Sequence, residues 1–155
     1  MMAEVYQALR LDFQKPRGKH IGQSLGEGGD KGFKTSLTLL IVDDCKDLLH
    51  ILGKCIAVYA DGYNILTACG AEEAIEVLRS IPVDVLLTDL YMPGMNGFDL
   101  AAFTKKHYPS TRMIAMSGED RNIPQDQINN LGISAVIKKP FNIDRLMSVV
   151  MDRAA

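Results

Sequence analysis

The chain has 155 residues, of which 47% are hydrophobic and 23% are charged. This length and composition predict one compact domain with an apolar core, and they exclude a disordered or fibrous chain. The formal net charge is −2, but residues 1–35 hold six basic and four acidic side chains, whereas residues 36–155 hold eleven and fifteen. The acidic part argues against a nucleic-acid-binding surface.

Two further classes of protein are disfavoured by the sequence. No apolar run is long enough to cross a membrane, and the first residues lack the basic and apolar pattern of a leader, so we expect a cytoplasmic protein. The three cysteines, Cys45, Cys55 and Cys69, are odd in number and lack CxxC spacing. Neither a disulfide framework nor a zinc site is therefore indicated.

The first 35 residues differ in character from the rest of the chain. A polar, glycine-rich stretch at 18–32 can bury little apolar surface against the entropy cost of ordering it. We therefore expect a flexible N-terminal extension over residues 1–35 and a single domain over residues 36–155.

From Leu37 onward, short apolar runs alternate with amphipathic stretches, which is the pattern of parallel βαβ units. We expect strands over residues 37–43, 63–68, 83–89, 112–117 and 135–138. Strands that alternate with helices predict an α/β fold, with an open parallel sheet that is covered by helices on both faces.

Each predicted strand is followed by a segment whose apolar residues recur at three and four. In the first of these segments Leu48, Leu52, Cys55 and Tyr59 form a stripe that we expect to face the sheet. The second segment starts after Gly70 and the third after Gly97. The fourth runs over 124–131 and stops at Gly132, and the fifth begins at Asn142, a residue that favours helix starts.

Polar side chains stand where the predicted strands end. Asp43 and Asp44 follow the first strand, Asp89 the third, Ser117 the fourth and Lys139 the fifth. The carboxyl ends of parallel strands meet at one edge of a sheet, which is where open α/β sheets bind ligands. We therefore expect three carboxylates, a hydroxyl and an ammonium to converge there.

This set of side chains indicates phosphoryl chemistry. Carboxylates that are crowded together need a cation, and oxygen ligands without His or Cys favour Mg²⁺ or a similar ion such as Mn²⁺. Asp89 is the expected nucleophile, because the paired aspartates are placed to hold the metal. Lys139 and Ser117 are expected to neutralise the phosphoryl oxygens.

Each residue also has a simpler interpretation. An acidic pair after a strand commonly only starts a helix, Asp89 and Ser117 fit ordinary turns, and Lys139 fits a solvated charge. For Gly94 and Gly97 we expect backbone angles that a tight loop requires. The simpler interpretation does not explain why all five polar residues end strands at one edge.

The sequence resembles the response-regulator receiver domains of two-component signalling. The resemblance rests on Asp43-Asp44, on the segment 88–97 (Thr-Asp-Leu-Tyr-Met-Pro-Gly-Met-Asn-Gly), on Ser117-Gly118 and on Lys139-Pro140-Phe141, and it covers residues 37–151. It implies the flavodoxin-like (βα)5 fold with three α/β/α layers and strand order 2-1-3-4-5. It also implies a cis peptide bond before Pro140.

The resemblance further implies ligands and partners. Asp44 and Asp89 would bind Mg²⁺ directly, Asp43 mainly through water, and the Tyr91 carbonyl would complete the set. A histidine kinase or phosphotransfer protein would donate to Asp89. Because no second domain follows the last predicted helix, we expect output by docking to another protein through the fourth helix, fifth strand and fifth helix, as a monomer or a phosphorylation-dependent dimer.

One position departs from the family pattern, and two competing functions stay open. Receiver domains commonly carry Tyr or Phe three residues before the lysine, where this chain has Val136, which puts the usual coupling to the outer surface in doubt. The main alternative is a receiver-like interaction module that is not phosphorylated. An aspartyl-nucleophile phosphatase would need a second Asp two residues after Asp89, where Tyr91 stands.

Overall fold

The computed structural model describes residues 36–60, 62–118 and 122–152. Its strands are β1 (Leu37–Val42), β2 (Tyr63–Ala68), β3 (Val85–Asp89), β4 (Arg112–Gly118) and β5 (Ile133–Lys139). Its helices are α2 (Lys46–Tyr59), α3 (Ala71–Ser80), α4 (Gly97–His107), α5 (Gln125–Leu131) and α6 (Ile143–Met151). The predicted extension over residues 1–35 lies outside the described residues.

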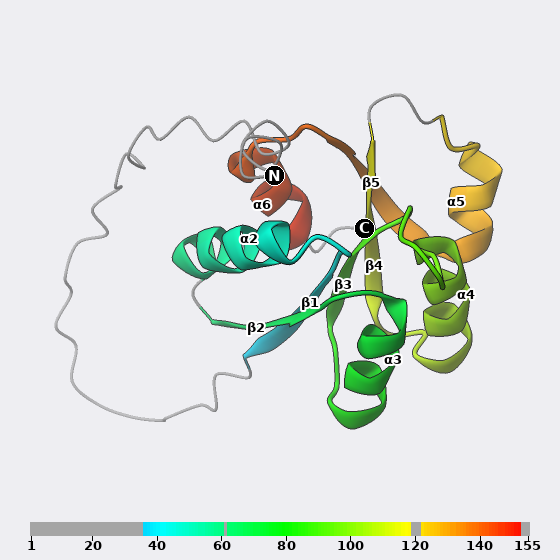
Figure 1. The fold of residues 1–155 in the computed structure, drawn as a ribbon, viewed down its shortest axis with the longest axis horizontal. Coiled ribbons are helices and arrows are strands. Elements are labelled where there is room, and N and C mark those ends of the chain that lie inside the picture. Colours follow the sequence, from blue (N-terminus) through cyan, green and yellow to red (C-terminus); the bar gives the residue numbers. More distant parts are fainter. Residues whose placement is uncertain (1–35, 61, 119–121, 153–155) are drawn as a thin grey trace, which may run out of the picture.

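The strands form one parallel sheet in the order β2-β1-β3-β4-β5, as the resemblance implies, and the predicted fold class is confirmed (Figure 1). Helices α2 and α6 cover one face of the sheet, while α3, α4 and α5 cover the other (Figure 1). Among the described residues, no helix combines the length and apolar character that a membrane crossing requires.

Two apolar clusters, one on each face, fix the sheet between its helices. Alternate residues of β1 divide between them: Leu39 and Ile41 pack toward α2 and α6, whereas Leu40 and Val42 pack toward α3 and α4. All four side chains are fully buried. A strand buried on both faces reads as a continuous apolar run, which is why β1 is recognisable in the sequence.

The core-facing stripe of α2 is rotated from the predicted one. Leu48, Leu49, Leu52 and Ile56 are buried, whereas Cys55 and Tyr59 are only half-buried. The helix packs on the sheet and on α6 together, so the side chains between these two surfaces are covered most completely. The spacing of apolar residues predicts that the helix has an apolar stripe. It does not predict which neighbouring elements pack against that stripe.

Several strand boundaries also differ from the prediction by one or two residues. The most informative is β3, which begins at Val85 rather than at residue 83. The Val83 carbonyl accepts a hydrogen bond from Thr111 Oγ1, and the Asp84 N–H donates to the Thr38 carbonyl. Thr111 and Thr38 therefore hold these two residues at the amino edge of the sheet, just before β3 begins.

Helix termini follow the predicted chemistry. The Asn142 side chain accepts a hydrogen bond from the Arg145 N–H at 2.8 Å, which caps α6, and Gly132 ends α5 with a left-handed φ of 70°. Gly94 has the expected positive φ of 74°. Gly97 differs from the prediction: a Cβ there would lie 2.0 Å from the Asp89 carbonyl oxygen, so its role is close approach of backbones.

Candidate functional site

The carboxyl ends of the strands gather the acidic residues that the sequence singles out. Asp43 directly follows β1, Asp44 comes next, and Asp89 is the last residue of β3. One carboxylate oxygen from each lies within 4.8 Å of the others. Asp43 and Asp89 are buried and Asp44 is exposed, so the cluster has one side open to solvent.

Lys139, the last residue of β5, reaches back over the sheet to this cluster. Its Nζ donates to Asp43 Oδ2 at 2.8 Å and to Asp89 Oδ2 at 2.5 Å. The Lys139-Pro140 peptide bond is cis, as the resemblance implies. The structure thus joins one ammonium to Asp89, the expected nucleophile, and to Asp43, the first of the paired aspartates.

In each of the two buried carboxylates, one oxygen accepts from a backbone N–H and the other accepts from Lys139. Asp43 Oδ1 accepts from the Cys45 N–H at 2.9 Å, and Asp89 Oδ1 accepts from the Tyr91 N–H at 2.9 Å. The Oδ2 atoms of both point to Lys139. Backbone donors from the following loops therefore fix the side-chain orientation, while the other oxygens share the Lys139 ammonium.

Burial and charge oppose each other at this cluster. Burial raises the pKa of Asp43 above its ordinary value of 3.8, although the nearby Lys139 ammonium works in the opposite direction. For Lys139, burial alone would lower the pKa, but the Asp43 and Asp89 carboxylates outweigh it and hold the pKa above 10.5. The ammonium is therefore charged at neutral pH.

Ser117 and Asp44 make no hydrogen bond to Lys139, unlike Asp43 and Asp89. Ser117, near the end of β4, is buried, and its hydroxyl donates to the Gly118 carbonyl at 3.3 Å rather than to an acidic side chain. The Asp44 carbonyl accepts from the Cys69 thiol at 3.6 Å, which ties the β1–α2 loop to the end of β2. Ser117 thus stands at the predicted edge without a bond to the acids.

Two supporting contacts were missed by sequence reasoning. Thr88 is buried, and its hydroxyl donates to the Asp89 carbonyl at 2.9 Å. A threonine within the apolar run before Asp89 is the signal that could have found it. The Tyr91 ring packs edge-on against Phe98 of α4, with centroids 5.5 Å apart, a contact for which the sequence gives no signal.

The donor set fits a hard divalent cation. Asp43, Asp44 and Asp89 offer carboxylate oxygens within 4.8 Å of one another, and no imidazole or thiolate belongs to this group. Oxygen-only ligands and an open side that leaves room for water suit Mg²⁺ or Mn²⁺ better than zinc or copper. Three crowded carboxylates with one ammonium also leave a net negative charge for a cation to offset.

Comparison with known proteins places this geometry in a family. The model of the response regulator receiver domain family matches residues 39–151. The autoinducer 1 sensor kinase/phosphatase LuxN of Vibrio campbellii is 38% identical over 117 residues, which are 74% of this chain and 13% of that protein. The response regulator GtcR of Aneurinibacillus migulanus is 33% identical over 109 residues, 69% of this chain and 43% of that protein.

A solved structure agrees with this placement. The signal receiver domain of an HD domain-containing protein from Pseudomonas fluorescens superposes with a TM-score of 0.68 and 26% identity, over 74% of this chain and 90% of that chain. The present chain spans less than half the length of the two sequence relatives. The similarity to them is therefore a similarity to one of their domains.

Proposed function

The chain belongs to the response-regulator receiver family, and on this basis we propose that it is a phosphoacceptor switch of two-component signalling. Asp89 takes a phosphoryl group from a histidine kinase or phosphotransfer protein in a reaction that needs Mg²⁺ or Mn²⁺. One observation carries the proposal: the Asp89 carboxylate is bonded to Lys139 and clustered with the acidic groups of Asp43 and Asp44.

The proposed reaction is an in-line displacement at phosphorus. An oxygen of the Asp89 carboxylate forms a bond to phosphorus as the bond from phosphorus to the donor's imidazole nitrogen breaks, and the imidazole leaves with its electron pair. The Lys139 ammonium and the Ser117 hydroxyl stabilise the charge on the phosphoryl oxygens. The product is an acyl phosphate on Asp89.

The residues that would hold the cation are the carboxylates of Asp43, Asp44 and Asp89 and the carbonyl of Tyr91. When bound, the ion supplies positive charge that offsets the carboxylates and the incoming phosphoryl oxygens. The buried Asp43 and Asp89 carboxylates are already oriented by the N–H groups of Cys45 and Tyr91, so little reorganisation of these side chains is needed before the reaction.

The output follows from a change of conformation rather than from turnover of an external substrate. The acyl phosphate favours one of two states, and that state docks a downstream protein through α5, β5 and α6. The only chemistry expected of the domain is its own phosphorylation and dephosphorylation. We place it in the cytoplasm, as a monomer or a phosphorylation-dependent dimer, without direct contact to nucleic acid or membrane.

The test is phosphorylation of the full chain by acetyl phosphate. Incubation with acetyl phosphate and Mg²⁺ should add the mass of one phosphoryl group, as measured by intact mass spectrometry, and a chelator should prevent the addition. Beryllofluoride with Mg²⁺ should shift the amide resonances of the site, because it imitates the acyl phosphate.

Asp89→Asn is the matched variant for this experiment. It keeps the side-chain shape and an acceptor oxygen but cannot form an acyl phosphate. An adduct that persists in this variant, or a wild-type chain that takes neither adduct nor beryllofluoride, contradicts the proposed function and leaves the interaction module that is not phosphorylated as the better explanation.

A further inference from the structure

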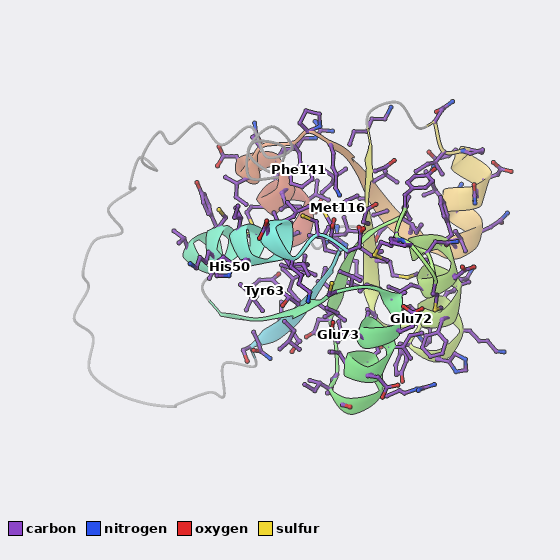
Figure 2. All side chains as sticks on the ribbon, viewed as in Figure 1. His50, Tyr63, Glu72, Glu73, Met116 and Phe141 are labelled. Atoms are coloured by element: carbon purple, nitrogen blue, oxygen red, sulfur yellow. The ribbon has the colours of Figure 1, made fainter. Side chains whose placement is uncertain are left out.

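Two neighbouring glutamates in the first turn of α3 have different partners. Glu73 Oε2 accepts from the Cys69 N–H at 2.6 Å, which closes the start of its own helix. Glu72 Oε1 instead accepts from the Met95 N–H at 3.4 Å, in the loop between β3 and α4. Figure 2 shows both side chains at the start of α3, with Glu72 on the side of α4. Both side chains are exposed, so they differ in the direction in which they point and not in their burial class.

The loop that Glu72 contacts runs over residues 90–96 and connects Asp89 to α4. Its first part is held by the Tyr91 N–H, which donates to Asp89 Oδ1, and its last residue, Asn96, caps α4. Between these two anchors lies Gly94, whose φ is 74°.

Glu72 holds the middle of this loop from outside. Its Oε1 lies 3.4 Å from the place that a Cβ on Gly94 would occupy and 3.4 Å from the Met95 nitrogen. The same carboxylate oxygen thus accepts from Met95 and lies beside the backbone of Gly94. Among the described residues, Glu72 supplies the side-chain acceptor for the Met95 N–H.

From this contact we propose that Glu72 is a positioning residue for the cation site. By accepting from the Met95 N–H it holds the loop 90–96 in the conformation in which the Tyr91 carbonyl can serve as a ligand. The assignment rests on the proposed function, because the Tyr91 carbonyl belongs to the proposed ligand set. Groups that orient ligands from behind commonly set metal affinity, because a ligand that is ordered beforehand loses less entropy on binding.

Two variants of Glu72 distinguish an effect of its hydrogen bond from an effect of its negative charge. Glu72→Ala removes both the acceptor oxygen and the negative charge, whereas Glu72→Gln removes the charge and keeps an acceptor oxygen. Positioning through the Met95 N–H therefore predicts that Gln restores what Ala loses. A contribution from negative charge near the cation predicts that Gln and Ala behave alike.

The experiment is a Mg²⁺ titration of the full chain, followed by the amide resonances of the site. Glu72→Ala should raise the half-saturating Mg²⁺ concentration about threefold, the size expected for one exposed hydrogen bond. Glu72→Gln should stay close to wild type. At saturating Mg²⁺ the rate of phosphorylation by acetyl phosphate should be the same in all three proteins, because Glu72 does not touch the reacting atoms.

Glu73→Ala is the matched control, because it shortens another exposed glutamate of the same helix turn. It should lower the thermal midpoint through loss of the cap at the Cys69 N–H and leave the Mg²⁺ affinity unchanged. Equal affinities for wild type and Glu72→Ala, or a Glu72→Gln variant as weak as Glu72→Ala, would overturn the assignment alone. A wild-type chain that binds no Mg²⁺ would overturn the proposed function, and the assignment with it.

Discussion

At the amino end of the sheet, charged side chains bond to backbone groups, whereas at the carboxyl end two carboxylates also bond to the ammonium of a lysine. Asp84 Oδ2 accepts from the Thr38 N–H at 2.7 Å, and the Arg112 guanidinium donates to the Val149 and Val150 carbonyls at the end of α6. At the other end, Lys139 binds the Asp43 and Asp89 carboxylates.

This difference separates contacts that stabilise the fold from contacts that can take part in a reaction. A backbone partner is fixed by the fold and cannot leave without local unfolding, so the amino-end contacts stabilise. An ammonium on a flexible side chain can be redistributed when another charge arrives, so the carboxyl-end contacts can take part in a reaction. Variants at the two ends should therefore change different measured quantities.

The largest effect should come from Lys139→Ala. Removing the ammonium takes away charge stabilisation of the phosphoryl oxygens, which we expect to lower the rate of phosphorylation by acetyl phosphate about 100-fold. The rate is followed by intact mass at saturating Mg²⁺. Lys138→Ala, which shortens the exposed neighbouring lysine, should leave the rate within about twofold of wild type. Equal losses in the two variants would mean that general charge, not this contact, matters.

A backbone contact at the carboxyl end should respond through stability instead. A Cβ at Gly97 would lie 2.0 Å from the Asp89 carbonyl oxygen and 2.7 Å from the Leu90 Cα. Gly97→Ala should therefore lower the free energy of unfolding by about 3 kcal/mol, measured by urea denaturation. Gly118→Ala meets no atom within 4 Å and should change it much less. A Gly97→Ala protein as stable as wild type would show that the two backbones do not approach this closely.

At the amino end, Asp84→Ala should lower the free energy of unfolding by about 1 to 2 kcal/mol, because the Thr38 N–H loses its side-chain acceptor. The phosphorylation rate should not change. Asp84→Asn keeps an acceptor oxygen and should recover most of the stability. If Asp84→Ala slowed phosphorylation while its stability stayed unchanged, the division between the two ends would fail.

The smallest effect concerns pH. The folded pKa of Asp43 is raised above 3.8 by burial, so Asp43 gains a proton at a higher pH than an ordinary aspartate, and a protonated carboxyl is a poor ligand. Acidification below neutral pH should therefore weaken Mg²⁺ binding at a higher pH than it would with an ordinary aspartate ligand. In Asp43→Asn the affinity should be lower and its pH dependence flatter. A steeper profile in that variant would assign the proton to another group.

The fold was predictable from sequence because its determinants are local and repeated. Continuous apolar runs such as Leu39–Val42 mark strands that are buried on both faces, and Asn142 and Gly132 mark helix ends by their own chemistry. Boundaries such as the start of β3 were not predictable, because Val83 and Asp84 are held by Thr111 and Thr38, which are distant in sequence.

The candidate site was predictable to the level of residue type. Parallel strands bring their carboxyl ends to one edge, so the position of Asp89 or Lys139 at a strand end is enough to expect them together. Which oxygen of Asp89 binds the Tyr91 N–H, or which of two adjacent glutamates reaches Met95, depends on loop geometry that spacing does not encode. The effect of Val136, which is half-buried against the α3 and α4 face, stays a prediction.

The bond from Lys139 to Asp43 and Asp89 has one more consequence. Without a divalent ion, the domain carries its own counter-ion, since the ammonium neutralises part of the acidic charge from within the chain. In the proposed function, uptake of a divalent ion would be an exchange rather than a simple addition, because the ion would compete with the Lys139 ammonium for the same carboxylates. A lysine displaced in this way would become available for the incoming phosphoryl group.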